Sequence, residues 1–392
     1  MNKKIDIVIL AGGKGSRIKN LTNGNPKPLA KFNKIAFLQF LINYYSKFNL
    51  RNIFILAGYK GRLFKKNYHN QKQNFTNIKC FIEKTKLDTG GALHLIKNKV
   101  SRNFFLVNGD TYLLPDINKI IKKFDLKNKL GLMTVINSNN KNVKLNNLRL
   151  IKDQISFGKK NKIMNAGFYF LNKNIFKYIN KKKISLENEV LPKLINKKKI
   201  IGIKYNKYFI DIGTKSNFFK AKKKLPKLLR RPAAFFDRDG VINYDHGYVS
   251  NIKEFKFRNG VLKALKYLHK KKHYIFIVTN QGGIAKKRFS IKKFYSLHEV
   301  IKKKLTQKSI FIDDVEYCPH HPDGTNSKFK KKCDCRKPRT GMIKRINSKW
   351  IINLKKSFFI GDKITDKECA KRANLKFFYA EKNLYTQIKK IC

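Results

Sequence analysis

Long apolar segments are absent from this sequence of 392 residues. No apolar run approaches the roughly 18–20 residues that a membrane-spanning helix needs, so we expect no membrane partner. The sequence also lacks the pattern of a secretory leader. The positive charges of Met1–Lys4 precede only a short apolar stretch, which runs into Ala11–Gly13 rather than a cleavage site. The sequence therefore predicts a cytoplasmic protein.

Acidic residues are scarce. The chain has 24 Asp and Glu against 90 Lys and Arg, which gives a formal net charge of +66. Such an excess is typical of proteins that bind nucleic acids or anionic surfaces. The lysines are spread along the whole chain, however, and the accompanying abundance of Asn, Ile, Phe and Tyr is what A+T-rich codons encode. We therefore expect compositional drift and no nucleic-acid partner, although a basic surface would attract phosphorylated substrates.

The length predicts two or three domains, and a hydrophobic fraction of 42% is enough for a core in each. Two segments have the same outline: Ile5–Leu10 precedes a glycine-rich turn, and Ala233–Phe236 precedes an Asp-Arg-Asp-Gly turn. Continuous apolar runs of this kind are typical of buried parallel strands. Further such runs are Ile53–Ala57, Phe104–Val107, Phe168–Leu171, Tyr274–Thr279 and Ser357–Ile360, with helical patterns at Phe37–Phe48 and Gly260–His269.

Alternating strand and helix signals predict the α/β class, with two doubly wound, mainly parallel-sheet domains. The boundary is expected at a charged segment that ends in Pro232, just before the second initial strand. The predicted organisation is therefore a first domain over residues 1–222, a linker over 223–232 and a second domain over 233–392. The two halves share architecture but no motif, and we find no internal repeat.

A glycine-rich loop follows the first predicted strand. Its glycines let the backbone approach phosphates closely, and Arg17 would add a charge-assisted contact. No Gly-Lys-Ser/Thr ends the loop, so it is not a P-loop. An ordered set of further motifs follows it: Pro26–Leu29, Asp88–Gly91, Asn108–Asp110, Asn165–Gly167 and Asp211–Thr214.

This set resembles the hexose-1-phosphate nucleotidyltransferases, most closely their heptose-1-phosphate guanylyltransferase branch, over roughly residues 5–220. The resemblance implies a Rossmann-like fold and a nucleoside triphosphate partner, most simply GTP. It also implies roles for individual residues. Gly12, Gly13, Gly15 and Arg17 would hold the triphosphate, Lys27 would neutralise a phosphate, Gly90 and Gly91 would face the base, Asp110 and Asp211 would bind Mg²⁺, and Asn165 and Glu187 would touch the sugar.

Carboxylates also follow the strands of the second half. Asp237 and Asp239 are two residues apart directly after one strand, and Asp362 follows another. Because binding sites form at the carboxyl ends of parallel strands, we expect these groups to meet, with Thr279 and Lys337 beside them. Paired carboxylates suit metal binding, and one can act as nucleophile while the other transfers protons.

The order of these motifs resembles the haloacid dehalogenase-like phosphatases. The resemblance implies that Asp237 forms an aspartyl-phosphate and that Asp239 protonates the leaving alkoxide and then activates water. Thr279 and Lys337 would bind the phosphoryl group, whose charge needs electrostatic stabilisation. Asp362 would complete a Mg²⁺ site with Asp237 and the Asp239 carbonyl. Two further residues are expected at the same site, Asn280 with substrate and Arg336 beside Lys337.

Three of the six cysteines are close together in the sequence, and two histidines lie between the first and second of them. Cys318, His320, Cys333 and Cys335 can supply four N/S ligands to a tetrahedral Zn²⁺, with His321 as the alternative second ligand. Four protein ligands make a closed, structural site, which would hold the loop that delivers Arg336 and Lys337.

We call the segment from Cys318 to Cys335 the zinc loop. A resemblance to the heptose-1,7-bisphosphate 7-phosphatases is carried by this loop together with Asp245–Val249 and Thr279–Ala285. Gly282, however, stands where that family usually has serine. Histidinol-phosphate phosphatases share the zinc loop, so a phosphatase of that type fused to another sugar nucleotidyltransferase stays open. The two resemblances imply consecutive reactions on a phosphorylated heptose. A basic nucleic-acid-binding protein with degenerate enzyme domains is the remaining alternative, but it needs catalytic residues to be missing.

Overall fold

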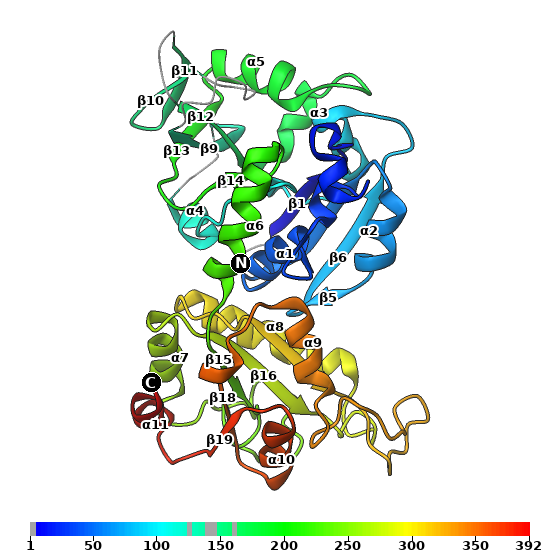
Figure 1. The fold of residues 1–392 in the computed structure, drawn as a ribbon, viewed down its shortest axis with the longest axis vertical. Coiled ribbons are helices and arrows are strands. Elements are labelled where there is room, and N and C mark those ends of the chain that lie inside the picture. Colours follow the sequence, from blue (N-terminus) through cyan, green and yellow to red (C-terminus); the bar gives the residue numbers. More distant parts are fainter. Residues whose placement is uncertain (1–4, 124–127, 138–146, 159–162) are drawn as a thin grey trace. The chain divides into compact units, whose positions relative to one another are not determined.

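The computed structural model describes residues 5–123, 128–137, 147–158 and 163–392 (Figure 1). Met1–Lys4, whose charges bear on the question of a leader, lie outside the described residues. The chain divides into two compact units, one formed by residues 1–45, 50–72 and 76–223 and the other by 46–49, 73–75 and 224–392. In the described ranges, no helix combines the length and the apolar character that a bilayer crossing requires.

The first unit is built on a ten-stranded mixed sheet in the order β10-β11-β13-β9-β12-β7-β1-β4-β6-β5. The strands are β1 Ile5–Ala11, β4 Leu50–Ala57, β5 Lys72–Gln73, β6 Thr76–Ile82, β7 Asn103–Asn108, β9 Gly131–Asn137, β10 Leu148–Ile151, β11 Gln154–Phe157, β12 Ile163–Asn172 and β13 Ile200–Lys204. The neighbours β7, β1, β4 and β6 are parallel, as the apolar runs predict. However, β12 is antiparallel to both β7 and β9, so the sheet is mixed rather than mainly parallel throughout.

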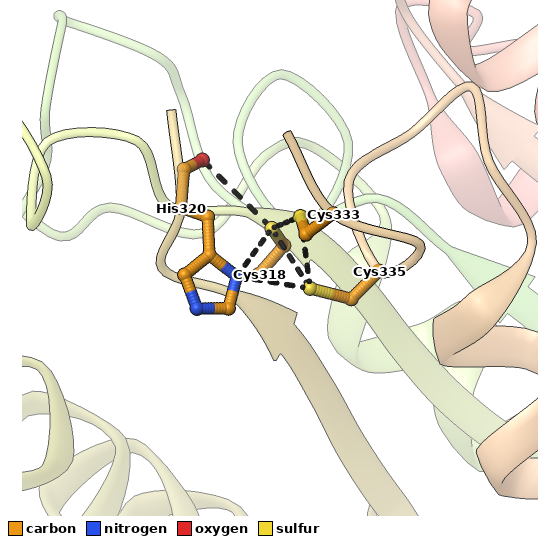
Figure 2. Close-up of side chains that lie close together, drawn as sticks. All are labelled: Cys318, His320, Cys333 and Cys335. Atoms are coloured by element: carbon orange, nitrogen blue, oxygen red, sulfur yellow. Dashed lines mark hydrogen bonds between the residues drawn. The ribbon is translucent and has the colours of Figure 1, made fainter. Parts of the chain in front are cut away.

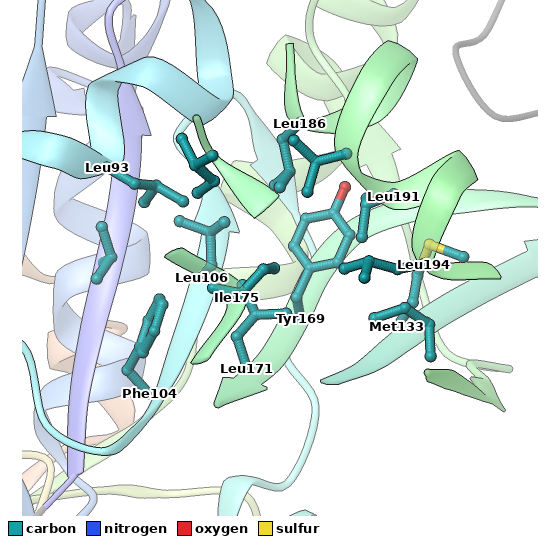
Figure 3. Packing of buried hydrophobic residues seen from close by; sticks show 14 of the residues in the cluster. Leu93, Phe104, Leu106, Met133, Tyr169, Leu171, Ile175, Leu186, Leu191 and Leu194 are labelled. Carbon is teal, nitrogen blue, oxygen red and sulfur yellow. The ribbon is translucent and has the colours of Figure 1, made fainter. Parts of the chain in front are cut away.

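Helices and short strands complete this unit. They are α1 Phe37–Ser46, α2 Gly61–Tyr68, α3 Asp88–Gly91, α4 Ile117–Lys123, α5 Leu191–Asn196, the single π-helical turn η6 Leu186–Val190, and the paired short strands β2 Lys31–Phe32 with β3 Ile35–Ala36 and β8 Thr111–Tyr112 with β14 Ile210–Asp211. Side chains of the sheet and of the segments over it form one buried cluster. Figure 3 shows Leu106, Tyr169 and Leu194 packed together within it.

The segment expected as a linker, residues 223–232, is largely helical. Helix α6 spans Lys215–Leu229 and includes Pro226. Phe218, Ala221 and Leu225 are buried along one side of the helix. Their spacing of three and four residues is that of one helix face, so burial offsets the missing amide of the proline. The two compact units divide between Lys223 and Lys224, inside this helix.

The second unit is a parallel five-stranded sheet in the order β17-β16-β15-β18-β19. Its strands are β15 Ala233–Phe236, β16 Tyr274–Asn280, β17 Asp314–Cys318, β18 Phe358–Gly361 and β19 Lys376–Tyr379, and its helices are α7 Val261–Lys270, α8 Ile291–Gln307, α9 Gly341–Lys349, α10 Ile364–Arg372 and α11 Leu384–Ile391. Buried clusters cover both faces of the sheet, which is why its central strands are apolar throughout. This confirms the predicted parallel α/β architecture.

Candidate functional sites

The carboxyl ends of β15, β16 and β18 carry the first site. Asp237 directly follows β15, Thr279 lies near the end of β16, and Asp362 follows β18. Because these strands are neighbours and parallel, their ends meet at one edge of the sheet. The structure thus brings together residues that are far apart in the sequence.

Lys337 lies among the carboxylates of this edge. Its Nζ is 2.9 Å from Asp237 Oδ1 and 2.6 Å from Asp366 Oδ1. The same Nζ donates to the Val278 carbonyl at 2.9 Å, and the residue is only 2% exposed. Burial by itself would lower the pKa of Lys337, but the two carboxylates raise it above its ordinary value, so the ammonium stays charged. A fixed cation beside Asp237 is suited to binding a phosphoryl group.

Asp237 is buried, and its carboxyl group is strongly influenced by this environment. Burial raises its pKa to about 7, with Asp366 and Asp239 adding to the rise and Lys337 opposing it. The backbone N–H of Arg238 donates to Asp237 Oδ1 at 2.7 Å. Burial makes the ionised form of Asp237 unfavourable unless a cation lies beside it. A metal ion would stabilise the ionised form, so Asp237 is suited to act as a metal ligand and as a nucleophile.

A magnesium ion fits this carboxylate cluster. Oxygen atoms of Asp237, Asp362 and Asp366 all lie within 4.8 Å of one another. Asp362 Oδ1 is buried, and no donor among the described residues reaches it. Carboxylate oxygens in such a group are the ligands that Mg²⁺ prefers. Asp366 was not identified from the sequence as a ligand, although it lies only four residues after Asp362.

Asp239 lies apart from that trio. Its side chain accepts hydrogen bonds from Arg238, Asn243 and Gln281. Gln281 Nε2 also lies 2.9 Å from Thr279 Oγ1, so one buried amide contacts both the expected acid/base and the expected phosphoryl-binding hydroxyl. Neither Arg238 nor Gln281 was singled out from the sequence.

Asn280 is engaged by protein rather than left free for substrate. Its Nδ2 donates to the Lys337 carbonyl at 3.1 Å, and the Lys337 N–H donates to its Oδ1 at 3.0 Å. The structure therefore gives Asn280 the task of holding the Lys337 backbone, while contact with substrate stays a prediction. Arg336 Nη1 donates to the His320 carbonyl at 3.2 Å, which places it beside the zinc loop.

The zinc loop forms a compact ligand cluster at the end of β17 (Figure 2). Cys335 Sγ is 3.2 Å from Cys318 Sγ, 3.3 Å from Cys333 Sγ and 3.2 Å from His320 Nδ1. All four ligand atoms lie within 4.8 Å of one another, and none of the cysteines is in a disulfide. Three sulfurs and one nitrogen at such separations fit tetrahedral Zn²⁺. His321 instead accepts from the Asp323 N–H, which favours His320 as the ligand.

The first unit holds a second carboxylate pair. The antiparallel β8 and β14 pair Thr111 with Asp211, and the Ile212 N–H donates to the Asp110 carbonyl at 3.0 Å. Burial raises the pKa of Asp211 to about 6, and the nearby Asp110 adds to the rise. Two carboxylates that repel each other in this way fit a divalent cation. Lys27 forms a salt bridge with Asp110.

The glycine-rich loop packs against the Lys27 side chain. Gly15 has a left-handed φ of 66°, and a Cβ there would lie 2.7 Å from Lys27 Cγ. Around Gly13 a Cβ would meet nothing within 4 Å. Arg17 lies in the 3₁₀ turn η1 Ser16–Ile18, close enough to influence the pKa of Asp211. The structure therefore gathers the loop, Lys27 and the carboxylates at one place, while their roles toward a nucleotide stay a prediction.

Gly90 and Gly91 have a packing role in the structure. Both are buried, and their N–H groups donate to the Ile184 carbonyl at 2.9 and 3.1 Å. A Cβ on Gly91 would lie 2.2 Å from the Lys182 oxygen. Their small size is therefore needed for close approach of two backbone segments, and the expected contact with a base stays a prediction.

Asn165 and Glu187 approach the same buried tyrosine. A register shift in β12 separates Asn165 from Tyr169, and Asn165 Nδ2 lies 2.6 Å from the Tyr169 hydroxyl. Burial raises the pKa of Tyr169 well above its ordinary value, and the negative charge of Glu187 adds to the rise. Thr89 donates to Glu187. The two expected sugar-binding residues are thus brought together.

Glu83 is a residue that the sequence did not single out. It follows β6, and the Leu87 N–H donates to its Oε2 at 3.1 Å. A Cβ placed on Gly12 would fall 2.4 Å from Glu83 Oε1, so the carboxylate lies against the glycine-rich loop. Burial raises the pKa of Glu83. A lone Glu between Ile82 and Lys84 carries no motif, and only the parallel pairing of β4 with β6 places it near the loop.

Comparisons with known proteins match the two halves to different families. Residues 6–146 match the family described as nucleotidyl transferase, and residues 232–385 match the family described as polynucleotide kinase 3 phosphatase. The D-glycero-beta-D-manno-heptose-1,7-bisphosphate 7-phosphatase of Photorhabdus laumondii is 44% identical over 144 residues, which are 37% of this chain and 77% of that protein. The Escherichia coli K12 protein of the same name is 42% identical over 144 residues, with 37% and 75% covered.

Among solved structures, that of HddC from Yersinia pseudotuberculosis is similar to 56% of this chain. The identity is 28%, the TM-score is 0.47, and the match covers 99% of the HddC chain.

Proposed function

The chain belongs to the D-glycero-beta-D-manno-heptose-1,7-bisphosphate 7-phosphatase family through its C-terminal half, and on this premise we propose that this half hydrolyses the 7-phosphate of heptose 1,7-bisphosphate. The chain also carries a nucleotidyltransferase domain. We infer that this domain joins the remaining 1-phosphate to a nucleotide, with GTP as the donor. The product would be GDP-heptose, with pyrophosphate released.

The observation that carries the phosphatase proposal is the arrangement around Lys337. One buried ammonium contacts Asp237 and Asp366 while Asp362 completes the carboxylate cluster. Mg²⁺ held by these carboxylates would neutralise charge on the phosphate. Zinc held by Cys318, His320, Cys333 and Cys335 would fix the loop from Cys333 to Lys337 and so support the position of that ammonium.

The chain's own residues divide the reaction between them. Asp237 attacks phosphorus to form an aspartyl-phosphate while Asp239 gives a proton to the departing sugar oxygen. Asp239 then takes a proton from the water that hydrolyses the intermediate. Lys337 and the Thr279 hydroxyl hold the phosphoryl oxygens through both steps, where charge stabilisation is the main requirement.

Nucleotidyl transfer needs positioning more than covalent catalysis, because the sugar phosphate is its own nucleophile. Lys27 would neutralise the phosphate at the point of attack, and Asp110 and Asp211 would hold Mg²⁺. The Glu83 carboxylate against the glycine-rich loop supports guanine as the base, since guanine presents two adjacent N–H donors to a carboxylate. Adenine has no such pair of donors on its pairing edge.

The phosphatase proposal is tested by phosphate release from heptose 1,7-bisphosphate in both anomers, with histidinol phosphate as competitor and Asp237→Asn as control. Fast release from one heptose anomer, lost in the variant, is the expected result. Preference for histidinol phosphate would overturn the heptose assignment.

The nucleotide is tested by pyrophosphate release from each of the four nucleoside triphosphates with heptose 1-phosphate. We expect GTP to react fastest and Glu83→Gln to lower kcat/KM for GTP by about 10–100-fold, because the amide can accept only one of the two N–H bonds. Equal use of all four triphosphates by the unchanged protein would contradict the assignment of guanine to Glu83.

A further inference from the structure

Arg238 is the largest side chain that the second unit buries almost completely, with 1% of its surface exposed. It lies between the two aspartates of the Asp-Arg-Asp-Gly turn, and no role follows for it from the sequence motifs. A buried guanidinium is costly unless its donors are used and its charge is balanced. The contacts of Arg238 therefore indicate its role.

The main partner of Arg238 is Asp239. Arg238 Nε lies 3.0 Å from Asp239 Oδ1, and Nη2 lies 2.9 Å from Oδ1 and 2.8 Å from Oδ2. This is a two-pronged contact to both carboxylate oxygens, which fixes orientation as well as distance. Asn243 Nδ2 and Gln281 Nε2 each add one bond at 3.0 Å.

Arg238 is itself anchored by groups other than Asp239. Nη2 donates to the Val249 carbonyl at 2.8 Å, and Nη1 lies 3.3 Å from His298 Nε2. The guanidinium carbon lies 5.7 Å from the centre of the Phe294 ring. Burial and the charge of Arg238 lower the pKa of His298 well below its ordinary value, so the imidazole is neutral and can accept this bond. The guanidinium is thus held at a fixed place.

The Asp239 carboxyl group is partly exposed to solvent. Its side chain is 16% exposed, whereas that of Arg238 is 1% exposed. The carboxyl group is therefore held from the protein side and accessible from the site. This is the geometry that a proton-transferring group needs, since its reacting oxygen must face the substrate while the rest of the group is fixed.

We propose that Arg238 is the positioning residue for the acid/base Asp239. The proposal rests on the phosphatase reaction given above. In the first step a bond forms between an Asp237 oxygen and phosphorus, the bond from phosphorus to the sugar oxygen breaks, and the Asp239 proton goes to that oxygen. In the second step water attacks the phosphoryl group, its proton returns to Asp239, and Asp237 is released as a carboxylate. Arg238 touches no reacting atom and acts by orienting Asp239.

This role affects substrates differently according to their leaving group. A sugar alkoxide leaves poorly without a proton, so hydrolysis of heptose 1,7-bisphosphate depends on a well-placed Asp239. Dinitrophenolate is stable without a proton, so release from dinitrophenyl phosphate needs the nucleophile and the cations but not the acid. A loss of general structure would slow both reactions alike.

The test compares the two substrates in Arg238→Lys, which keeps the charge but loses the two-pronged contact. We expect kcat/KM for the heptose bisphosphate to fall about 100-fold and that for dinitrophenyl phosphate to change by about 3-fold or less. Asp239→Asn should show the same selectivity. The ratio of the two rates in one sample does not depend on the folded fraction. Arg372→Lys, an exposed replacement of the same kind, should change neither rate.

An equal loss on both substrates would overturn the positioning role while leaving the phosphatase function intact. A wild-type protein that releases phosphate from neither substrate would instead contradict the proposed function. If Arg238→Lys does not fold, His298→Leu decides, because it removes the acceptor of Arg238 Nη1 and leaves the contacts between Arg238 and Asp239 in place. A selective loss on the heptose ester supports the proposal, and an equal loss, or none, refutes it.

Discussion

Asn280 and Lys337 are joined by two reciprocal hydrogen bonds between the Asn280 side-chain amide and the Lys337 main chain, at 3.1 and 3.0 Å. They lie far apart in the sequence, one on β16 and the other just after the zinc loop. The pairing fixes the main chain from which the Lys337 ammonium reaches Asp237. A strand end and the loop that follows the Cys/His cluster thereby both position one cation.

Loss of this pairing should impair hydrolysis more than binding. In Asn280→Ala the Lys337 backbone loses both partners, so we expect kcat for phosphate release to fall about 10–100-fold, with a smaller change in KM. Steady-state kinetics measure both. Asn280→Asp keeps the acceptor for the Lys337 N–H, so its kcat should lie between those of Asn280→Ala and the wild type. A KM effect alone would indicate direct substrate contact instead.

Removal of the Lys337 charge should destabilise the second unit. Lys337→Met leaves Asp237 and Asp366 buried without a cation, so the free energy of unfolding should fall by about 3–5 kcal/mol in magnesium-free buffer. Urea denaturation followed by circular dichroism measures the change, and phosphate release should be lost. Lys371→Met on the exposed side of α10 is the control. Unchanged stability would show that the carboxylates need no fixed cation.

Zinc should be bound by the four-residue cluster alone. We expect about one zinc ion per chain by elemental analysis, and almost none in Cys335→Ser, whose melting temperature should also fall. Cys392→Ser removes a cysteine outside the cluster and should retain the metal. Equal zinc content in the two variants would exclude this cluster as the site.

Two glycines of the first unit should respond differently to replacement by alanine. Gly91→Ala places a Cβ 2.2 Å from the Lys182 oxygen, so the free energy of unfolding should fall by about 1–3 kcal/mol. Gly13→Ala meets nothing within 4 Å and should leave stability unchanged. Because Gly13 is expected to lie against the triphosphate, this variant should instead raise KM for the nucleotide. Thermal melts and nucleotidyl-transfer kinetics separate the two effects.

The second unit should lose stability in mild acid through His298. Burial lowers the pKa of this imidazole well below 6.5, so the unfolded chain binds the proton more readily than the folded one. The stabilising contribution is therefore present above pH 6.5 and is lost as the pH falls below it, with a slope of up to about 1.4 kcal/mol per pH unit. His298→Gln, which can still accept from Arg238, should reduce this dependence.

The measurement for His298 is the difference in unfolding free energy between the two proteins from pH 7.5 to 5. Taking a difference removes the other titrating groups, among them Asp237, whose raised pKa acts in the opposite sense. If the unfolding free energies of the wild type and His298→Gln change in parallel with pH, His298 does not contribute to the pH dependence of stability.

The sequence by itself determined the α/β class, the principal strands and the four Cys and His residues that gather in one cluster. Continuous apolar runs such as Ile53–Ala57 and Tyr274–Thr279 are recognisable because strands buried on both faces admit few polar side chains. Cys333 and Cys335 are recognisable because metal ligation imposes close spacing along the chain. These constraints are local, so they leave a local pattern.

The tertiary structure alone decided several of the side-chain contacts in the two sites. Glu83 reaches the glycine-rich loop through strand pairing, Asp366 reaches Lys337 through the turn into α10, and Arg238 turns toward Asp239 rather than solvent. The antiparallel direction of β12 and the helix across the expected linker also became apparent only in the tertiary structure. Such contacts depend on the packing of elements distant in sequence, and no spacing along the chain encodes them.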